Sequence, residues 1–211
     1  MRVPVLLFLV VFSFFASAQD ADFPDYRSKK ENFLRLRDAT IRNDLATFTM
    51  AGIDESMNKP PLKTIPMTSF GTNSIAFEGN GIQVIVQAAG FNITKHKLTY
   101  YNEKHLVKID NKPYYGNYGK APTSILQSLI VLIDKDTVAI PAAALADLYD
   151  PSFAYKDASG VQRSQNRVYL SPDNRTIYIY LLSRNNGGTE VTWVIRDKKY
   201  LQRVVDFGFL K

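Results

Sequence analysis

The fold class is decided by residues 167–207, which read RVYLSPDNRTIYIYLLSRNNGGTEVTWVIRDKKYLQRVVDF. Four runs rich in β-branched and aromatic residues alternate here with three turn sequences, at 171–174, 185–188 and 197–199. Proline, glycine, asparagine and aspartate favour turns, and the runs between them have the length and composition of strands. The C-terminal part of the chain is therefore predicted to be an antiparallel β-meander.

Two runs of this chain predict different exposure of their strands to solvent. In residues 189–196 apolar and polar side chains alternate, with Val191, Trp193 and Ile195 on one face. This alternation predicts a strand of an antiparallel sheet that is wet on its other face. Residues 125–133, ILQSLIVLI, are almost continuously apolar. They predict a central strand that is buried on both faces.

The fold class predicted for the whole chain is α+β, with an N-terminal helical segment packed on a largely antiparallel, β-rich sheet. Strands follow one another after a helical opening, and no long helices alternate with them, which argues against a parallel α/β fold. The other predicted elements are a helix over 29–50, a hairpin of 74–78 and 82–88 around Gly79-Asn80-Gly81, a hairpin of 97–101 and 106–109, and a short helix near 142–149.

The first eighteen residues predict export. One positive charge at Arg2 precedes an apolar run over 3–15, and Ala16-Ser17-Ala18 is a small-residue cleavage site. This is the pattern of a secretory signal peptide. We therefore expect residues 1–18 to be a signal peptide cleaved after Ala18, 19–27 a flexible leader and 28–211 a single β-rich domain. The mature protein is expected to be soluble, periplasmic or secreted, with no transmembrane segment.

Composition limits the chemistry that this chain can perform. It contains no cysteine and only two histidines, His96 and His105, and its formal net charge is +6. In the predicted hairpin the two histidines lie roughly 16 Å apart, at about 3.3 Å per residue, which is too far for a shared metal ion. We therefore expect no metal site and no cofactor. A thiol enzyme is excluded, and nucleic acid is not an expected partner of an exported protein.

The most distinctive surface predicted from the sequence lies in residues 95–120. This stretch carries six lysines and only two acidic residues, Glu103 and Asp110, together with five of the twelve tyrosines. Within it, residues 112–119 form a turn-rich loop in which rigid aromatic contact area stands beside glycines. If this loop is a ligand platform, at least two of its tyrosine rings must face solvent. The candidate ligand-binding residues are Tyr114, Tyr115, Tyr118, Lys112 and Lys120.

The sequence favours an exported binding or interaction module whose partner is an anionic polysaccharide or an envelope protein. A hydrolase of envelope or extracellular polymers is one alternative. It would require two carboxylates, or Ser56 with Lys59, to converge in a pocket, since Ser56-x-x-Lys59 matches a short element of serine enzymes. A purely structural envelope protein is the other alternative, and it would be favoured by the absence of any cleft.

Overall fold

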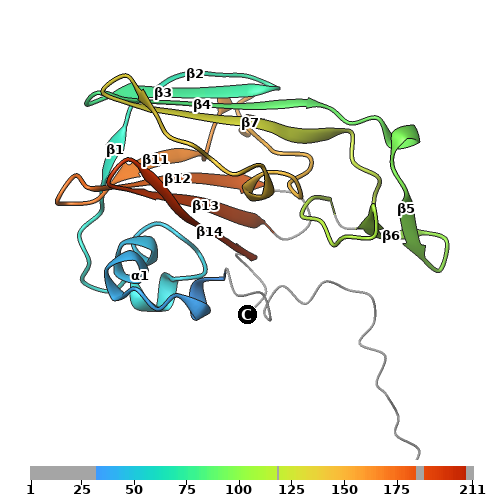
Figure 1. The fold of residues 1–211 in the computed structure, drawn as a ribbon, viewed down its shortest axis with the longest axis horizontal. Coiled ribbons are helices and arrows are strands. Elements are labelled where there is room, and N and C mark those ends of the chain that lie inside the picture. Colours follow the sequence, from blue (N-terminus) through green and yellow to red (C-terminus); the bar gives the residue numbers. More distant parts are fainter. Residues whose placement is uncertain (1–31, 118, 184–187, 208–211) are drawn as a thin grey trace, which may run out of the picture.

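Two antiparallel sheets pack face to face at the centre of the molecule, and an N-terminal helical segment lies on the outer face of one of them (Figure 1). This computed structural model describes residues 32–117, 119–183 and 188–207. The expected signal peptide, the leader and Tyr118 lie outside the described residues. The molecule is mostly antiparallel β-sheet with few short helices, which confirms the β-rich fold class.

The predicted meander forms most of the sheet that the helical segment contacts, which we call the covered sheet. Its strands run in the order β1-β11-β12-β13-β14, and consecutive strands of the meander pair antiparallel. Their bounds are β1 (Lys63–Ile65), β11 (Arg167–Leu170), β12 (Thr176–Ser183), β13 (Thr189–Arg196) and β14 (Lys199–Phe207).

The second sheet, which we call the open sheet, has the order β2-β3-β4-β7-β8. The Asn80-Gly81 turn joins β3 to β4, and both of its residues have positive φ (53° and 73°), as a two-residue type I′ hairpin turn requires. This hairpin confirms the sequence prediction. The strand bounds are β2 (Met67–Phe70), β3 (Ser74–Gly79), β4 (Ile82–Gly90), β7 (Ser124–Ile133) and β8 (Asp136–Thr137).

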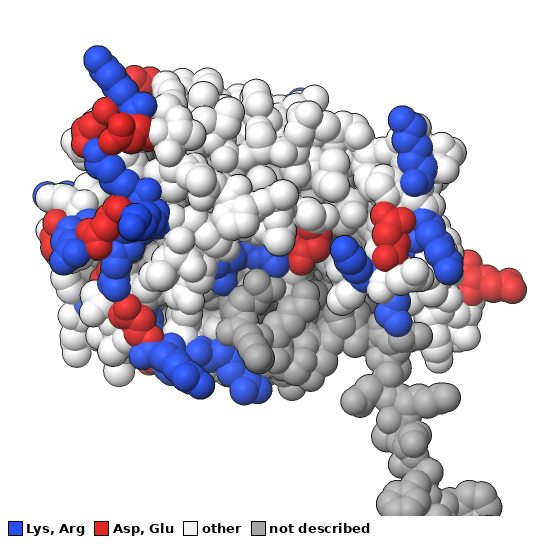
Figure 2. Space-filling view, in the orientation of Figure 1, with Lys and Arg blue, Asp and Glu red and all other residues white. Residues whose placement is uncertain are grey.

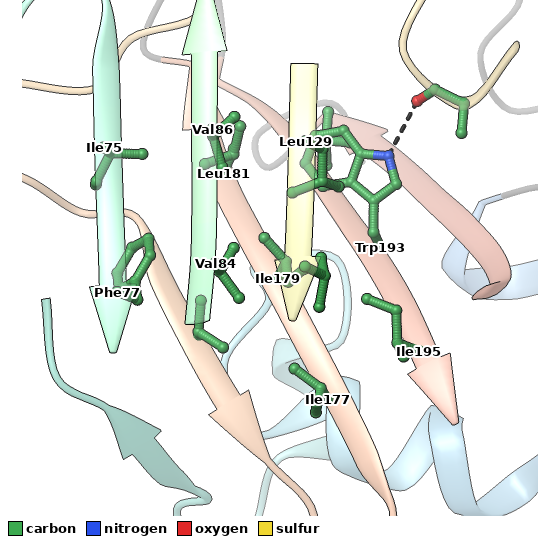
Figure 3. Close-up of a cluster of buried hydrophobic side chains, with 14 of the residues drawn as sticks. Ile75, Phe77, Val84, Val86, Leu129, Ile177, Ile179, Leu181, Trp193 and Ile195 are labelled. Atoms are coloured by element: carbon green, nitrogen blue, oxygen red, sulfur yellow. Dashed lines mark hydrogen bonds between the residues drawn. The ribbon is translucent and has the colours of Figure 1, made fainter. Parts of the chain in front are cut away.

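The main hydrophobic core fills the space between the two sheets (Figure 3). Phe77 and Val84 of the open sheet and Ile179 and Trp193 of the covered sheet are completely buried there. The Trp193 indole N–H donates a hydrogen bond of 2.9 Å to the carbonyl of Ala144, so the polar atom of this buried ring is satisfied. Alternate residues of each strand point into this core, as the period of a β-strand dictates.

The N-terminal helical segment, residues 32–55, covers the outer face of the covered sheet. It contains η1 (Phe33–Arg35), α1 (Ala39–Ala46) and η2 (Ile53–Glu55). Within the described part of the chain, the predicted helix over 29–50 is therefore much shorter than expected. The Asp38 side chain caps α1 by accepting from the N–H groups of Thr40 and Ile41, and this capping fixes where the helix begins.

Buried acidic side chains fasten this segment to the covered sheet. Glu190 accepts the backbone N–H groups of Met50 and Ala51, at 2.8 and 3.1 Å, and the hydroxyl of Tyr180 at 2.7 Å. Asp206 stands directly opposite Glu190 in the β13–β14 register and accepts the N–H of Phe33 at 2.7 Å. The backbone of the helical segment thus depends on carboxylates of the sheet for its hydrogen bonds.

The structure reverses both predictions about solvent. Strand β13 is not wet on one face, because the helical segment covers Glu190 and Thr192, each only 2% exposed. Strand β7 is not buried on both faces, since Ile130 on its outer side is 39% exposed. Burial of the outer faces is decided by where the N-terminal segment docks, and that is not written in the strand sequences.

The remaining elements are short and lie outside the two five-stranded sheets. Strands β5 (Leu98–Tyr101) and β6 (His105–Ile109) form the second predicted hairpin, which projects beyond the sheets (Figure 1). The short helix predicted near 142–149 is a single 3₁₀ turn, η4 (Ala142–Ala144), followed by turns. The other short elements are η3 (Ile93–Lys95), β9 (Tyr155–Lys156) and β10 (Gln162–Arg163).

Asp206 makes the stability of the fold depend on pH. Burial raises its pKa to about 7, the nearby Glu190 acts in the same direction, and the Phe33 N–H only partly offsets them. The folded chain therefore holds a proton between about pH 4 and pH 7 that the unfolded chain has released, and the free energy of unfolding falls as the pH rises through this window. We expect the protein to be roughly 2–3 kcal/mol less stable at pH 8 than at pH 5 on account of this residue.

The measurement is urea denaturation of the wild type and of Asp206→Asn at both pH values. Asparagine keeps an acceptor for the Phe33 N–H but carries no charge, so the variant should lose most of the difference between pH 5 and pH 8. Burial also raises the pKa of Asp44, which is present in both proteins. In both, the free energy of unfolding should therefore still fall with rising pH, but by a smaller amount. An equal slope in wild type and variant would show that Asp206 is not the responsible group.

Candidate functional site

Among the described residues of the region that the sequence singled out, the most exposed aromatic side chains lie on the hairpin of β5 and β6. Tyr100 and Tyr101 are each 43% exposed near its tip. We call residues 95–112, which contain this hairpin, the basic arm. Because a tyrosine ring combines rigid apolar area with a polar hydroxyl, adjacent exposed tyrosines are suited to contact a ligand.

Lysines surround these two tyrosines. Residues 95–120 contain six lysines and two acidic residues, a net charge of +4 out of +6 for the whole chain. The carboxylate of one of the two acidic residues, Asp110, has partners within the arm. It accepts from the backbone N–H of Lys97 and lies 2.7 Å from Nδ1 of His96. The hydrogen bond with His96, followed by that of Lys97, lowers the pKa of Asp110. The arm therefore presents a predominantly positive surface.

The prediction that at least two of Tyr114, Tyr115 and Tyr118 present a ring face to solvent is wrong. Tyr114 is 4% exposed and Tyr115 is 1% exposed, and Tyr118 is not among the described residues, so at least two solvent-facing rings cannot be found in this loop. Lys112 and Lys120 are exposed, as a surface site requires. The two described tyrosines are buried because the loop folds back over the end of the sandwich.

Tyr114 anchors the base of the arm. Its hydroxyl lies 3.2 Å from the carbonyl of Leu106 in β6, and its ring packs edge-on against Tyr149 at a centroid distance of 5.8 Å. Phe91, four residues before the arm, also contacts Tyr149 edge-on, at 5.0 Å. Gly119 pairs with Leu106 at a φ of +74°, where an added Cβ would meet the ring of His105 at 3.0 Å. This cluster joins the base of the arm to the end of the sandwich.

Tyr115 belongs to a second anchor, which connects the loop to the covered sheet. Its backbone N–H donates to the carbonyl of Asp147 at 2.8 Å. The guanidinium of the buried Arg203 lies 5.7 Å from the Tyr115 ring centre and donates to the Ala144 carbonyl and to both oxygens of Asp147. Charge-assisted pairs of this bidentate kind are strong and directional. The loop is therefore a rigid support for the arm.

A groove of about 570 Å³ opens beside the base of the arm, a size that accommodates a small ligand or a segment of a polymer. We call it the end groove. It is formed by six separate parts of the chain, and its lining is rich in amides and hydroxyls and includes two aromatic rings. The lining side chains with polar groups are Thr72, Asn73, Asn117, Thr123, Ser124, Asp150, Ser152, Tyr155, Lys156 and Gln162.

Asp150 organises the floor of the end groove. Its carboxylate accepts the N–H groups of Thr123 and Ser124, at 2.9 and 3.0 Å, and the side-chain amide of Asn117 at 3.1 Å. The residue is 8% exposed and has a φ of 46°. Asp150 also accepts from the hydroxyls of Thr123 and Ser124, so it holds three of the polar lining side chains in place and fixes the groove wall.

A smaller recess lies behind the end groove, and the two share Pro151 and Ser152 in their linings. Its walls are apolar, with Leu126 and Trp193 among them, and its volume is about 30 Å³. That is room for about two water molecules. The end groove, and not this recess, has the dimensions of a ligand site.

Two sets of groups that the hydrolase alternative could use have structural hydrogen-bond partners instead. Ser56 donates its hydroxyl proton to the carbonyl of Ile53, whereas the Lys59 ammonium donates to Asn43, so the two side chains serve different partners. Glu190 and Asp206 do converge, but both accept hydrogen bonds from the N-terminal segment that covers them. This carboxylate pair fastens the segment to the sheet.

Several residues that line the end groove could not be found from the sequence. Asn73, Asp150 and Gln162 come together only because the β2–β3 connection, the loop at Asp150 and the β9–β10 pair meet there, and no local pattern marks them. Within residues 32–117, 119–183 and 188–207, no cluster of three potential metal ligands occurs, and no helix is long and apolar enough to cross a membrane. No family model matches this sequence, and comparison with curated proteins and solved structures gives no match.

Proposed function

We propose that this protein is an exported, non-enzymatic binding module that holds an anionic polysaccharide with the basic arm and the adjacent end groove. The observation that carries this proposal is the position of Tyr100 and Tyr101, both exposed on a projecting hairpin that is surrounded by lysines. Sugar rings stack on tyrosine faces through their C–H groups, and the lysines supply attraction for carboxylate or sulfate substituents.

The chemistry of the end groove supports the same class of ligand. Its lining offers amides and hydroxyls, which donate and accept hydrogen bonds as the hydroxyl groups of a sugar do. Lys156 adds a positive charge, and Gly90 at the rim has no atom within 4 Å of an added Cβ, which leaves space for close approach to the backbone. A chain bound along the arm would therefore meet hydrogen-bonding partners where it reaches the sandwich.

The proposal is tested by binding of polygalacturonate, with uncharged dextran as the second probe. Replacing both exposed tyrosines, Tyr100→Ala with Tyr101→Ala, removes two ring contacts worth about 0.5–1.5 kcal/mol each. We expect binding of polygalacturonate to weaken about tenfold or more, with thermal unfolding nearly unchanged. Lys97→Glu with Lys104→Glu should weaken it further at low salt, and the difference should shrink as salt is added.

The matched control is Lys63→Glu with Lys199→Glu, which makes the same change in net charge at exposed positions away from the arm. This variant should bind polygalacturonate like the wild type. The proposal fails if the wild type does not bind the anionic polymer, or if the control variant loses as much binding as the arm variant. If the arm variants lost binding to an envelope protein but still bound polygalacturonate, the arm would be assigned to that protein partner instead.

A further inference from the structure

The open sheet is almost free of charge, although the chain is rich in lysine and arginine. Residues 64–94 contain a single charged residue, Glu78, and residues 121–133 contain none. None of the five strands β2, β3, β4, β7 and β8 carries a lysine or an arginine, while the chain has 26 of them. Figure 2 views the sandwich from the side: in its upper part, where the open sheet lies, charged side chains gather towards the two ends, with an uncharged area between them. Edge strands that face solvent are ordinarily protected by charged residues, above all lysine, and neither edge strand of this sheet, β2 or β8, carries a lysine.

The outer side of the open sheet is also apolar at its centre. Cross-strand register places Ala76, Ile85 and Ile130 in one row across β3, β4 and β7. The residues on either side of these in the same strands, such as Val84 and Val131, are completely buried in the core, so the row itself points outward. Ile130 is 39% exposed. Amides and hydroxyls flank the row, for example Gln87 and Ser128, whose side chains hydrogen-bond at 3.1 Å.

The covered sheet also has an apolar outer face, and there a segment of the same chain packs on it. On the covered sheet the corresponding residues Tyr178, Val194 and Val204 are at most 4% exposed, because the N-terminal helical segment packs on them. On the open sheet no helix of the described residues occupies the equivalent position (Figure 1). One sandwich thus has one face closed by its own chain and one uncharged face left uncovered.

We propose that a second copy of this chain packs on the outer face of the open sheet, related by a two-fold axis near Ile130. In a two-fold interface each residue near the axis meets its own copy. Charged groups would therefore repel one another there, whereas isoleucines pack together, and glutamine or serine side chains can donate to and accept from themselves. With a net charge of +6, two copies approach at the lowest electrostatic cost through the face that carries no basic residue.

The size of the face predicts a weak dimer. Five strands at about 4.8 Å spacing and about six residues at about 3.3 Å each give roughly 480 Å² per copy. Two such faces bury roughly 1,000 Å², which is near the lower limit for a specific interface. We therefore expect a monomer–dimer equilibrium with a dissociation constant on the order of 10 μM or higher. This inference is independent of the proposed polysaccharide binding, because the arm lies at the end of the sandwich.

Sedimentation velocity of the purified protein between about 1 and 200 μM tests the proposal, because this range brackets the expected dissociation constant. The wild type should shift from monomer to dimer. Ile130→Lys places two lysines against each other at the axis, and it should raise the dissociation constant at least about tenfold. The matched control Leu201→Lys makes the same charge change at an exposed residue of β14 in the covered sheet and should dimerise like the wild type. Circular dichroism checks that the variants fold.

A mixing experiment makes the test specific for the axis. Ile130→Glu alone should also be monomeric, but an equal mixture of Ile130→Lys and Ile130→Glu should form heterodimers, since opposite charges then meet. The proposal is overturned if the wild type stays monomeric throughout the range, if Ile130→Lys dimerises normally, or if the mixture fails to associate. It is also overturned if the wild type and Ile130→Lys are both monomeric and the variant no longer binds the polysaccharide. The outer face of the open sheet would then be part of the polysaccharide site.

Discussion

Trp193→Ala should reduce the free energy of unfolding by about 3–5 kcal/mol, the largest loss that we expect from a single substitution in the core. The Trp193 side chain is completely buried between the two sheets (Figure 3), and it is among the largest fully buried side chains of the described residues. Truncation removes its packing against both sheets and leaves a cavity that the rigid β-sandwich can fill only in part. Urea denaturation measures the loss.

The same substitution also removes a hydrogen bond, and a second variant separates the two effects. Trp193→Phe retains much of the apolar volume but lacks the N–H that Ala144 accepts. Arg203 also donates to this carbonyl, at 3.1 Å, so the acceptor keeps a partner. The phenylalanine variant should therefore lose about 1–2 kcal/mol, clearly less than the alanine variant. Equal losses in the two variants would show that packing of the ring contributes little.

Glu190→Ala should destabilise the protein by a similar amount, about 3–5 kcal/mol, but through its polar contacts. Three donors, the N–H groups of Met50 and Ala51 and the hydroxyl of Tyr180, would lose their acceptor in a buried place. Each buried donor left without a partner costs about 1–3 kcal/mol. Because these donors lie on the helical segment or beneath it, the segment should detach before the sheets unfold.

Hydrogen exchange distinguishes this local effect from a general one. In Glu190→Ala the amides of residues 33–55 should exchange much faster, while those of β4, β7 and β12 keep most of their protection. Glu190→Gln is the control, because its remaining carbonyl oxygen can still accept from Met50 and Tyr180, and its loss should be intermediate. If protection fell uniformly over both sheets, Glu190 would be a part of the global core and not a local fastening.

The candidate site was only partly predictable from the sequence. The concentration of lysine and tyrosine in residues 95–120 is a property of composition, and the structure places part of this stretch on a projecting hairpin. Which tyrosines face solvent was not predictable, because Tyr114 and Tyr115 are buried by contacts with Tyr149 and Arg203 from distant parts of the chain. The end groove likewise depends on six segments of the chain meeting.

Local physics in the sequence determined the strands and their turns. The Asn80-Gly81 turn needs only two residues that tolerate positive φ, and the meander over 167–207 needs only short apolar runs between turn residues. These elements can be predicted from their local sequence, without knowledge of contacts to distant parts of the chain. The same holds for Trp193, whose place on the inner face follows from the two-residue period of its strand.

Only the tertiary structure decided which outer faces are dry. Strand β13 reads as a half-exposed strand and is buried on both sides, whereas β7 reads as a fully buried strand and has an open side. The difference comes from the N-terminal helical segment, which is fastened by Glu190 and Asp206 and therefore covers one sheet and not the other. Alternation within a strand records which residues share a face, but burial depends on what packs against that face, and this is set by contacts between residues up to 173 positions apart.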